Sequence, residues 1–144
     1  MACPLCERIG RIRTGTDPFF LREFQESYAV LADSRQYAGW STLILKSHKE
    51  HLVHLTVDRQ RALFGDVAKM ALAVQQACRP KRINYECLGN TLAHIHWHVI
   101  PRYEWDPQPK SPVWVRPAEE RQVQVSDEER DVLVAKLRKA LGAS

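Results

Sequence analysis

Half of the six histidines in this 144-residue chain lie within five consecutive positions. In the segment "AHIHWHVIPR", His94, His96 and His98 alternate with Ile95 and Trp97. Alternation is typical of a β-strand, in which residues two apart share a face and lie about 6.6 Å from one another. The pattern therefore predicts a strand with one apolar core face and one face made of imidazoles.

A row of imidazoles on one strand face has three interpretations. In the first, the histidines form an ordinary exposed polar face, although Asn, Thr or Lys would serve equally well there. In the second, all three bind one catalytic metal. In the third, a neutral imidazole is a nucleophile, while its neighbours orient it, bind phosphate oxygens or hold a separate structural metal.

Four segments have the composition and the length of strands. They comprise residues 19–34, which read as paired strands, 39–46, 82–88 and 93–103. Between the last two, Gly89 and Asn90 predict a tight reversal.

Two helices are predicted in addition to these strands. Apolar residues at spacings of four, three and four predict a long helix from Asp58 to Arg79, with Thr56 as its N-cap and Pro80 as its stop signal. The proline-rich segment that follows the histidine strand is predicted to cross the surface as a loop. A capping-box pair, Ser126 and Glu129, then begins a last helix that closes at Gly142.

Length and composition indicate one globular domain of the α+β class. No apolar run approaches the roughly 20 residues that span a membrane, and the first residues lack the apolar stretch of a secretion signal, so we expect a cytoplasmic protein. Twenty-one Lys and Arg against 17 Asp and Glu give a mild positive charge, which makes nucleic acid an unlikely partner. The pair Cys3 and Cys6 is typical of a metal clip or a redox motif.

The segment "HIHWHVI" fits the pattern His-x-His-x-His-x-x with every x apolar, and this pattern defines the histidine triad (HIT) superfamily. The chain resembles that family from about Phe19 to Tyr103. "INYECLGN" followed by "HWHVIPRY" is most similar to its bacterial diadenosine-tetraphosphate-hydrolase-like branch. The resemblance implies an antiparallel sheet with one long helix and a C-terminal helix. We divide the single domain into a zinc-clip N-terminus (1–18), a HIT core (19–103), and a proline-rich loop with the last helix (104–144).

The resemblance also implies a mechanism. His96 would attack the α-phosphorus of a nucleotide and form a nucleotidyl-histidine intermediate, which water then hydrolyses. His98 would bond a phosphate oxygen or protonate the leaving group.

By the same resemblance, Asn90 and Thr91 would donate hydrogen bonds to the phosphate, and Asn84 would lie beside the phosphate and the ribose. Asp33 would accept the ribose hydroxyls, and Leu31 would line the base pocket. Each has a simpler alternative, because an Asp before a loop is often only a turn residue.

A structural zinc site is predicted from two cysteines and two histidines, a ligand set suited to tetrahedral Zn²⁺. The expected ligands are Cys3, Cys6, His48 and His94. In the alternative, the two cysteines are free thiols near a mobile terminus, and His51 or His54 could in principle replace His48.

One departure from the family pattern concerns Trp40, which stands after Gly39 where many members have a histidine. Its indole would pack either beneath the triad or against a base. Related proteins are commonly homodimers, and we expect the same here because a dimer would cover an open sheet edge.

The expected function is hydrolysis at the α-phosphate of dinucleoside polyphosphates or nucleoside phosphoramidates. The alternatives are nucleotidyl transfer to a phosphate acceptor and a nucleotide-sensing module with vestigial catalysis.

Overall fold

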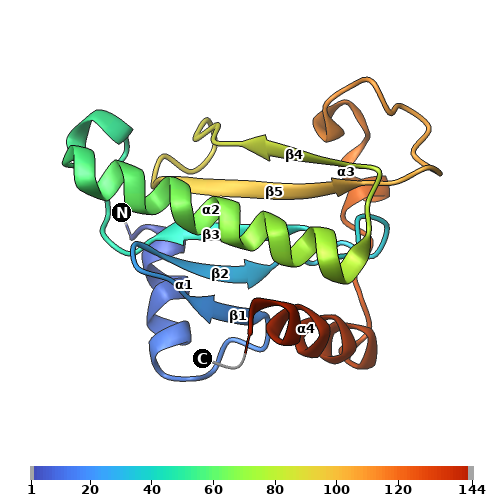
Figure 1. Cartoon of the computed structure of the whole chain (residues 1–144), viewed down its shortest axis with the longest axis horizontal. Coiled ribbons are helices and arrows are strands. Elements are labelled where there is room, and N and C mark those ends of the chain that lie inside the picture. The colour runs from blue at the N-terminus through green and yellow to red at the C-terminus, as the bar shows by residue number, and fades with distance from the viewer. Residues whose placement is uncertain (1, 143–144) are drawn as a thin grey trace.

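Five strands form one antiparallel sheet in the order β1-β2-β3-β5-β4. The computed structural model describes residues 2–142. The strands are β1 (Phe20–Glu23), β2 (Ser27–Leu31), β3 (Ser41–Leu45), β4 (Arg82–Glu86) and β5 (His96–Arg102). The HIT-like antiparallel sheet expected from the sequence is confirmed, and β5 lies between β3 and the edge strand β4 (Figure 1).

The long helix α2 (Val57–Cys78) crosses one face of the sheet, with the C-terminal helix α4 (Asp127–Leu141) beside it (Figure 1). The main core lies between these helices and the sheet. Its fully buried members include Leu31, Leu43, Met70 and Leu137. Burial of apolar surface between helices and sheet is the main term that stabilises this layer.

Both predicted helix starts are confirmed. The Thr56 hydroxyl accepts a hydrogen bond from the Arg59 backbone N–H at 3.3 Å, and Ser126 with Glu129 forms the complete capping box. Each such cap satisfies an otherwise unpaired N–H at a helix start and contributes about 1 kcal/mol.

The opposite face of the sheet carries the histidines, and we call it the histidine face. Helix α1 (Pro4–Arg13) packs on it beside β2 and β3, where its residues Leu5 and Ile9 contact Val30 and Ile44. On the other side, Tyr37 and Trp40 pack with Val113, which belongs to a 3₁₀ turn (Val113–Val115). The histidine face is therefore flanked by the N-terminal helix and by the segment that follows β5.

Three expectations from the sequence need correction. The first 18 residues were expected only to clip a metal, but they contain α1, whose buried Leu5, Ile9 and Ile12 have helical spacing. The prediction of a tight reversal at Gly89 and Asn90 is wrong. Strand β4 ends at Glu86 and β5 begins at His96, so residues 87–95 form a longer connection. The strand was also expected to include His94, which lies just before it.

The proline-rich segment is also more ordered than expected. Besides the 3₁₀ turn, it contains the short helix α3 (Ala118–Arg121). A buried ion pair fixes its start: Asp106, with a side chain 0% exposed, accepts hydrogen bonds from Arg102 at 2.6–2.7 Å. The tyrosine hydroxyl of Tyr37 also donates to Asp106, at 3.2 Å.

Gly39 fixes the approach to β3. Its φ is +96°, a conformation that favours glycine, and a Cβ added there would lie 2.6 Å from the Cys78 sulfur, so a larger residue would also displace the Cys78 side chain. The next residue, Trp40, packs with Tyr37, Ile100 and Val113.

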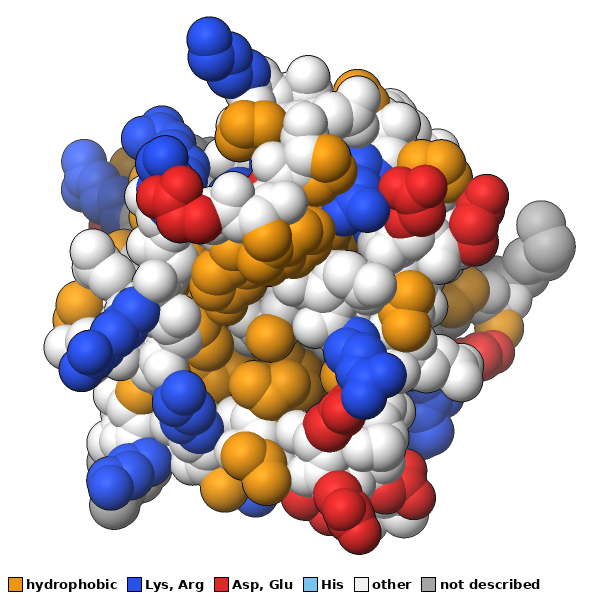
Figure 2. All heavy atoms as spheres, turned by 90° about the vertical axis from the view of Figure 1, so that its right-hand side faces the viewer, with side chains coloured by type: hydrophobic (Ala, Val, Ile, Leu, Met, Phe, Trp, Pro, Cys, Tyr) orange, Lys and Arg blue, Asp and Glu red, His pale blue; other side chains and the backbone are white. Residues whose placement is uncertain are grey.

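Hydrophobic side chains also gather in a hollow at the end of the molecule where α2 ends and α4 begins (Figure 2). Within residues 2–142, no helix combines the length and the apolar character needed to cross a bilayer.

Candidate functional site

His96 and His98 lie on β5 with ring centroids 5.1 Å apart. The Nδ1 atom of His96 is 2.8 Å from the backbone carbonyl oxygen of His94. Since a carbonyl can only accept, His96 donates through Nδ1–H, and its Nε2 carries the lone pair in the neutral ring. The fold therefore holds His96 in the tautomer that a nucleophile needs.

His98 has the opposite arrangement. The indole N–H of Trp40 donates to Nδ1 of His98 at 3.1 Å, so the neutral ring carries its proton on Nε2. Burial, with a smaller effect of His96, lowers the pKa of His98 to about 4. His98 is therefore a neutral hydrogen-bond donor at physiological pH. The open question about Trp40 is answered for this structure, because its indole packs against the triad.

Trp114 completes the cover over His98, and sequence reasoning missed it. Its ring lies edge-on to His98 at 5.3 Å and to Trp40 at 5.5 Å. Its indole N–H donates to the carboxylate of Glu86, which lies on β4 directly opposite His98. The sequence could have predicted only that Glu86 lies on the histidine face, from strand alternation. It carries no signal for the contacts of Trp114.

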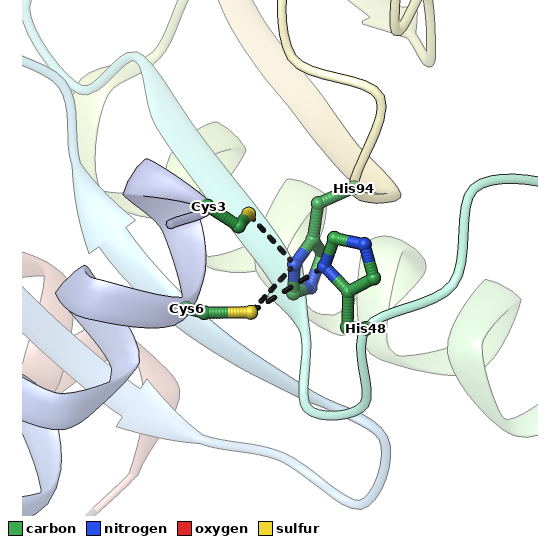
Figure 3. Close-up of side chains that lie close together, drawn as sticks. All are labelled: Cys3, Cys6, His48 and His94. Carbon is green, nitrogen blue, oxygen red and sulfur yellow. Dashed lines mark hydrogen bonds between the residues drawn. The ribbon is translucent and has the colours of Figure 1, made fainter. Parts of the chain in front are cut away.

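The four expected metal ligands come together from three distant parts of the chain (Figure 3). Cys3 is the N-cap of α1 and Cys6 lies in its first turn, His48 follows β3, and His94 precedes β5. Their ligand atoms all lie within 4.8 Å of one another. The Nδ1 atom of His94 is 3.5 Å from each cysteine sulfur, and Nδ1 of His48 is 3.4 Å from the sulfur of Cys6.

This geometry fits a tetrahedral ion. With Zn–S and Zn–N bonds of about 2.3 and 2.0 Å, neighbouring ligand atoms should be roughly 3.5 Å apart. The Nε2–H of His94 donates to the Leu45 carbonyl at 2.7 Å, which leaves Nδ1 as the free ligand atom. Burial lowers the pKa of His94, so the ring is neutral, as a metal ligand must be.

Asp33 is exposed on the loop after β2. One of its carboxylate oxygens accepts the Val125 backbone N–H at 2.9 Å. Leu31 is 1% exposed and belongs to the core under α2 and α4, and it also lines a small pocket together with Asp33 and Phe19. Roles for Leu31 and Asp33 in binding a nucleoside remain predictions.

Asn84 lies on β4, two residues before Glu86 and so on the histidine face. Its amide oxygen accepts a hydrogen bond from Arg102 at 2.8 Å. Asn90 and Thr91 are exposed on the connection that leads to His94. Their proposed contacts with phosphate also remain predictions.

Two of the cavities lie on opposite faces of the sheet. One of about 350 Å³ opens beside the triad and is lined by both His98 and Asp33. The larger one, about 660 Å³, lies between α2 and β4 and is lined by Phe64, Tyr85 and Trp97. Trp97 points away from the histidine face, so the larger cavity does not belong to this site.

Comparisons with known proteins agree with this geometry. Residues 14–105 match the model of the HIT domain. A HIT-like protein of 16.1 kDa from Mycoplasma pneumoniae is 31% identical over 112 residues, which cover 72% of this chain and 76% of that protein. "Protein hit" from Bacillus subtilis is 30% identical over 86 residues, or 56% of this chain, and the match spans only 59% of that relative.

Solved structures agree on the fold. A histidine triad protein from Sinorhizobium meliloti superposes with a TM-score of 0.76 at 24% identity, over 92% of this chain and 93% of that one. A zinc-bound histidine triad family protein from Mycobacterium smegmatis gives 0.71 at 22% identity, over 98% and 94%.

Proposed function

Since the chain belongs to the HIT family, whose proteins bind and hydrolyse nucleotides, we propose that it cleaves nucleotides at the α-phosphate through a covalent His96 intermediate. The proposed substrates are dinucleoside polyphosphates or nucleoside phosphoramidates. One observation carries the proposal: the 2.8 Å hydrogen bond from His96 Nδ1 to the His94 carbonyl. This bond makes Nε2 a ready nucleophile without prior loss of a proton.

In the proposed reaction, Nε2 of His96 forms a bond to the α-phosphorus while the bond to the leaving group breaks. Water then attacks the nucleotidyl-histidine and frees His96. The Nε2–H of His98 is the donor for the phosphate or for the leaving group, a role supported by the Trp40 hydrogen bond that fixes its tautomer. Asp33, Leu31, Asn84, Asn90 and Thr91 are the proposed substrate contacts.

We also propose that Cys3, Cys6, His48 and His94 hold a structural zinc ion. The ion would fasten α1 to the residue whose carbonyl orients the nucleophile, because His94 supplies both the Nδ1 ligand and the bond to His96. The metal would thus stabilise the geometry of His96 without taking part in the reaction.

A homodimer is the proposed assembly. Strand β4 is an edge of the sheet, and the groove beside it exposes Phe64 (63%), Leu72 (53%) and Tyr85 (54%). Apolar side chains this exposed beside an open strand edge are typical of a surface that another chain covers.

The test measures release of nucleoside monophosphate from diadenosine polyphosphates and adenosine phosphoramidate. His96→Ala should lower the rate by at least about 1,000-fold, whereas His51→Ala, at an exposed histidine outside the site, should not. Equal rates in wild type and His96→Ala would exclude the covalent mechanism. Tight binding of nucleotide without turnover would favour the sensing module instead.

A further inference from the structure

The chain after β5 returns to the histidine face and forms one wall of the cavity beside His98. Three hydrogen bonds fasten it to the loop after β2. They are Ser34 Oγ to the Arg121 carbonyl (2.6 Å), Arg35 N–H to the Val123 carbonyl (2.8 Å), and Val125 N–H to the Asp33 carboxylate (2.9 Å). This wall is therefore a fixed part of the site.

The cavity has a volume of about 350 Å³ and is lined by aromatic, polar and charged side chains. His98 and the two tryptophans Trp40 and Trp114 line one part of it. Asp33, Ser34, Thr42 and the polar side chains of the wall line most of the rest. The wall contributes Arg121, Gln122 and Gln124.

The Arg121 side chain is held in position, and its positive charge is not neutralised by an ion pair within residues 2–142. Its guanidinium lies 4.9 Å from the ring centroid of Trp114, and its Nε–H donates to the Arg116 carbonyl at 3.2 Å. Within residues 2–142, no carboxylate lies within ion-pair distance of it. The two terminal amino groups of a guanidinium so placed are available to an anion.

We propose that Arg121 contacts the substrate and binds the phosphate chain of the leaving group. The protein would then favour nucleotides whose leaving group is a phosphate over those whose leaving group is an amine. This proposal rests on the function proposed above.

The reaction itself explains the preference. When the bond from His96 Nε2 to phosphorus forms, the P–O bond breaks and its electron pair stays on the departing phosphate chain. A guanidinium beside that chain stabilises the added negative charge. An amine leaving group needs a proton and develops no such charge, so Arg121 offers it little.

The first experiment compares kcat/KM of the wild type and Arg121→Gln for diadenosine triphosphate and for adenosine phosphoramidate. The variant should lose about 100-fold with the first substrate and less than about 3-fold with the second. Lys110→Gln, which removes a charge from an exposed position of the same segment, is the matched control and should change neither. Equal losses with both substrates, or no loss with either, would overturn the proposal.

A second experiment does not depend on turnover. Calorimetry should show that the wild type binds ADP more tightly than AMP, and that Arg121→Gln loses most of this difference while its thermal midpoint and metal content stay unchanged. An unchanged difference overturns the role of Arg121 even if His96 is catalytic. If the difference disappears in a protein that hydrolyses nothing, the role of Arg121 stands and only the hydrolase function fails.

Discussion

At one end of the histidine segment, His94 donates Nε2–H to a backbone carbonyl and turns Nδ1 toward two thiols. At the other end, His98 accepts an indole N–H on Nδ1 and lies under two tryptophans. The residue type is the same, but the first environment suits a metal ion and the second keeps a neutral donor beside a cavity. Which nitrogen is occupied, and by what, decides the chemistry available to each ring.

The two ends also depend on different parts of the chain. The His94 end is closed by α1, which contributes its first turn, whereas the His98 end is closed by the segment after β5. A substitution that disturbs α1 should leave the segment after β5 in place, and the reverse should also hold. The orientation of His96, which lies between them, should change in both cases.

The largest expected effect comes from Asp106→Ala. The substitution leaves Arg102, whose side chain is only 5% exposed, without its ion-pair partner, and this should lower the free energy of unfolding by about 3–5 kcal/mol. Urea unfolding measures the loss, and the metal content should stay the same. Asp127→Ala, at a carboxylate 89% exposed, should cost less than about 1 kcal/mol. Similar losses in both variants would contradict the anchoring role of Asp106.

Cys6→Ser tests the cluster at the His94 end of the histidine segment. The variant should lose most of its zinc. At free zinc a hundred times the dissociation constant, this removes about 2.7 kcal/mol of stability. Elemental analysis and thermal unfolding measure both effects, with the half-buried Cys87→Ser as control. Wild-type protein, purified without added zinc, that holds much less than one zinc ion per chain would rule out the site.

The pH dependence of stability sharpens the description of His98. Its pKa is about 4 in the folded protein against about 6.5 when unfolded, so between these values the unfolded chain binds more protons. The contribution of His98 to stability should therefore be full well above pH 6.5 and should fall by about 2 kcal/mol by pH 5. Trp40→Phe removes the donor to Nδ1 and should shift the NMR titration of His98 upward. If His98 of the wild type titrates near pH 6.5, burial does not lower its pKa and this description is contradicted.

The smallest effect is expected for Trp114→Phe. The ring contact with His98 is largely kept, but the hydrogen bond to Glu86 is lost, so the variant should lose about 1 kcal/mol in urea unfolding. The half-exposed Trp105→Phe provides the comparison. A loss above about 3 kcal/mol would contradict this account, because Trp114 would then stabilise the whole fold and not only the packing over His98.

Strand alternation, helix spacing and caps predicted the strands, α2 and α4, because these are local signals. The set Cys3, Cys6, His48 and His94 was chosen by its resemblance to the family's positions, and the structure brings these four side chains together. Helix α1 was not predicted, although Leu5, Ile9 and Ile12 have helical spacing. The packing of Trp114 and Arg121 beside His98 has no local signal, since it depends on where an irregular segment folds back.

The central claim is that Nε2 of His96 forms a covalent bond to the nucleotide, and the most direct measurement is to capture that bond. Wild type and His96→Ala are mixed with diadenosine triphosphate, stopped within the first turnover by alkaline denaturation, and analysed by intact and peptide mass spectrometry. The mechanism predicts one added nucleotidyl group on the peptide that contains His96 in the wild type, and none in the variant. Rapid turnover with no adduct, or an adduct on another residue, would contradict it.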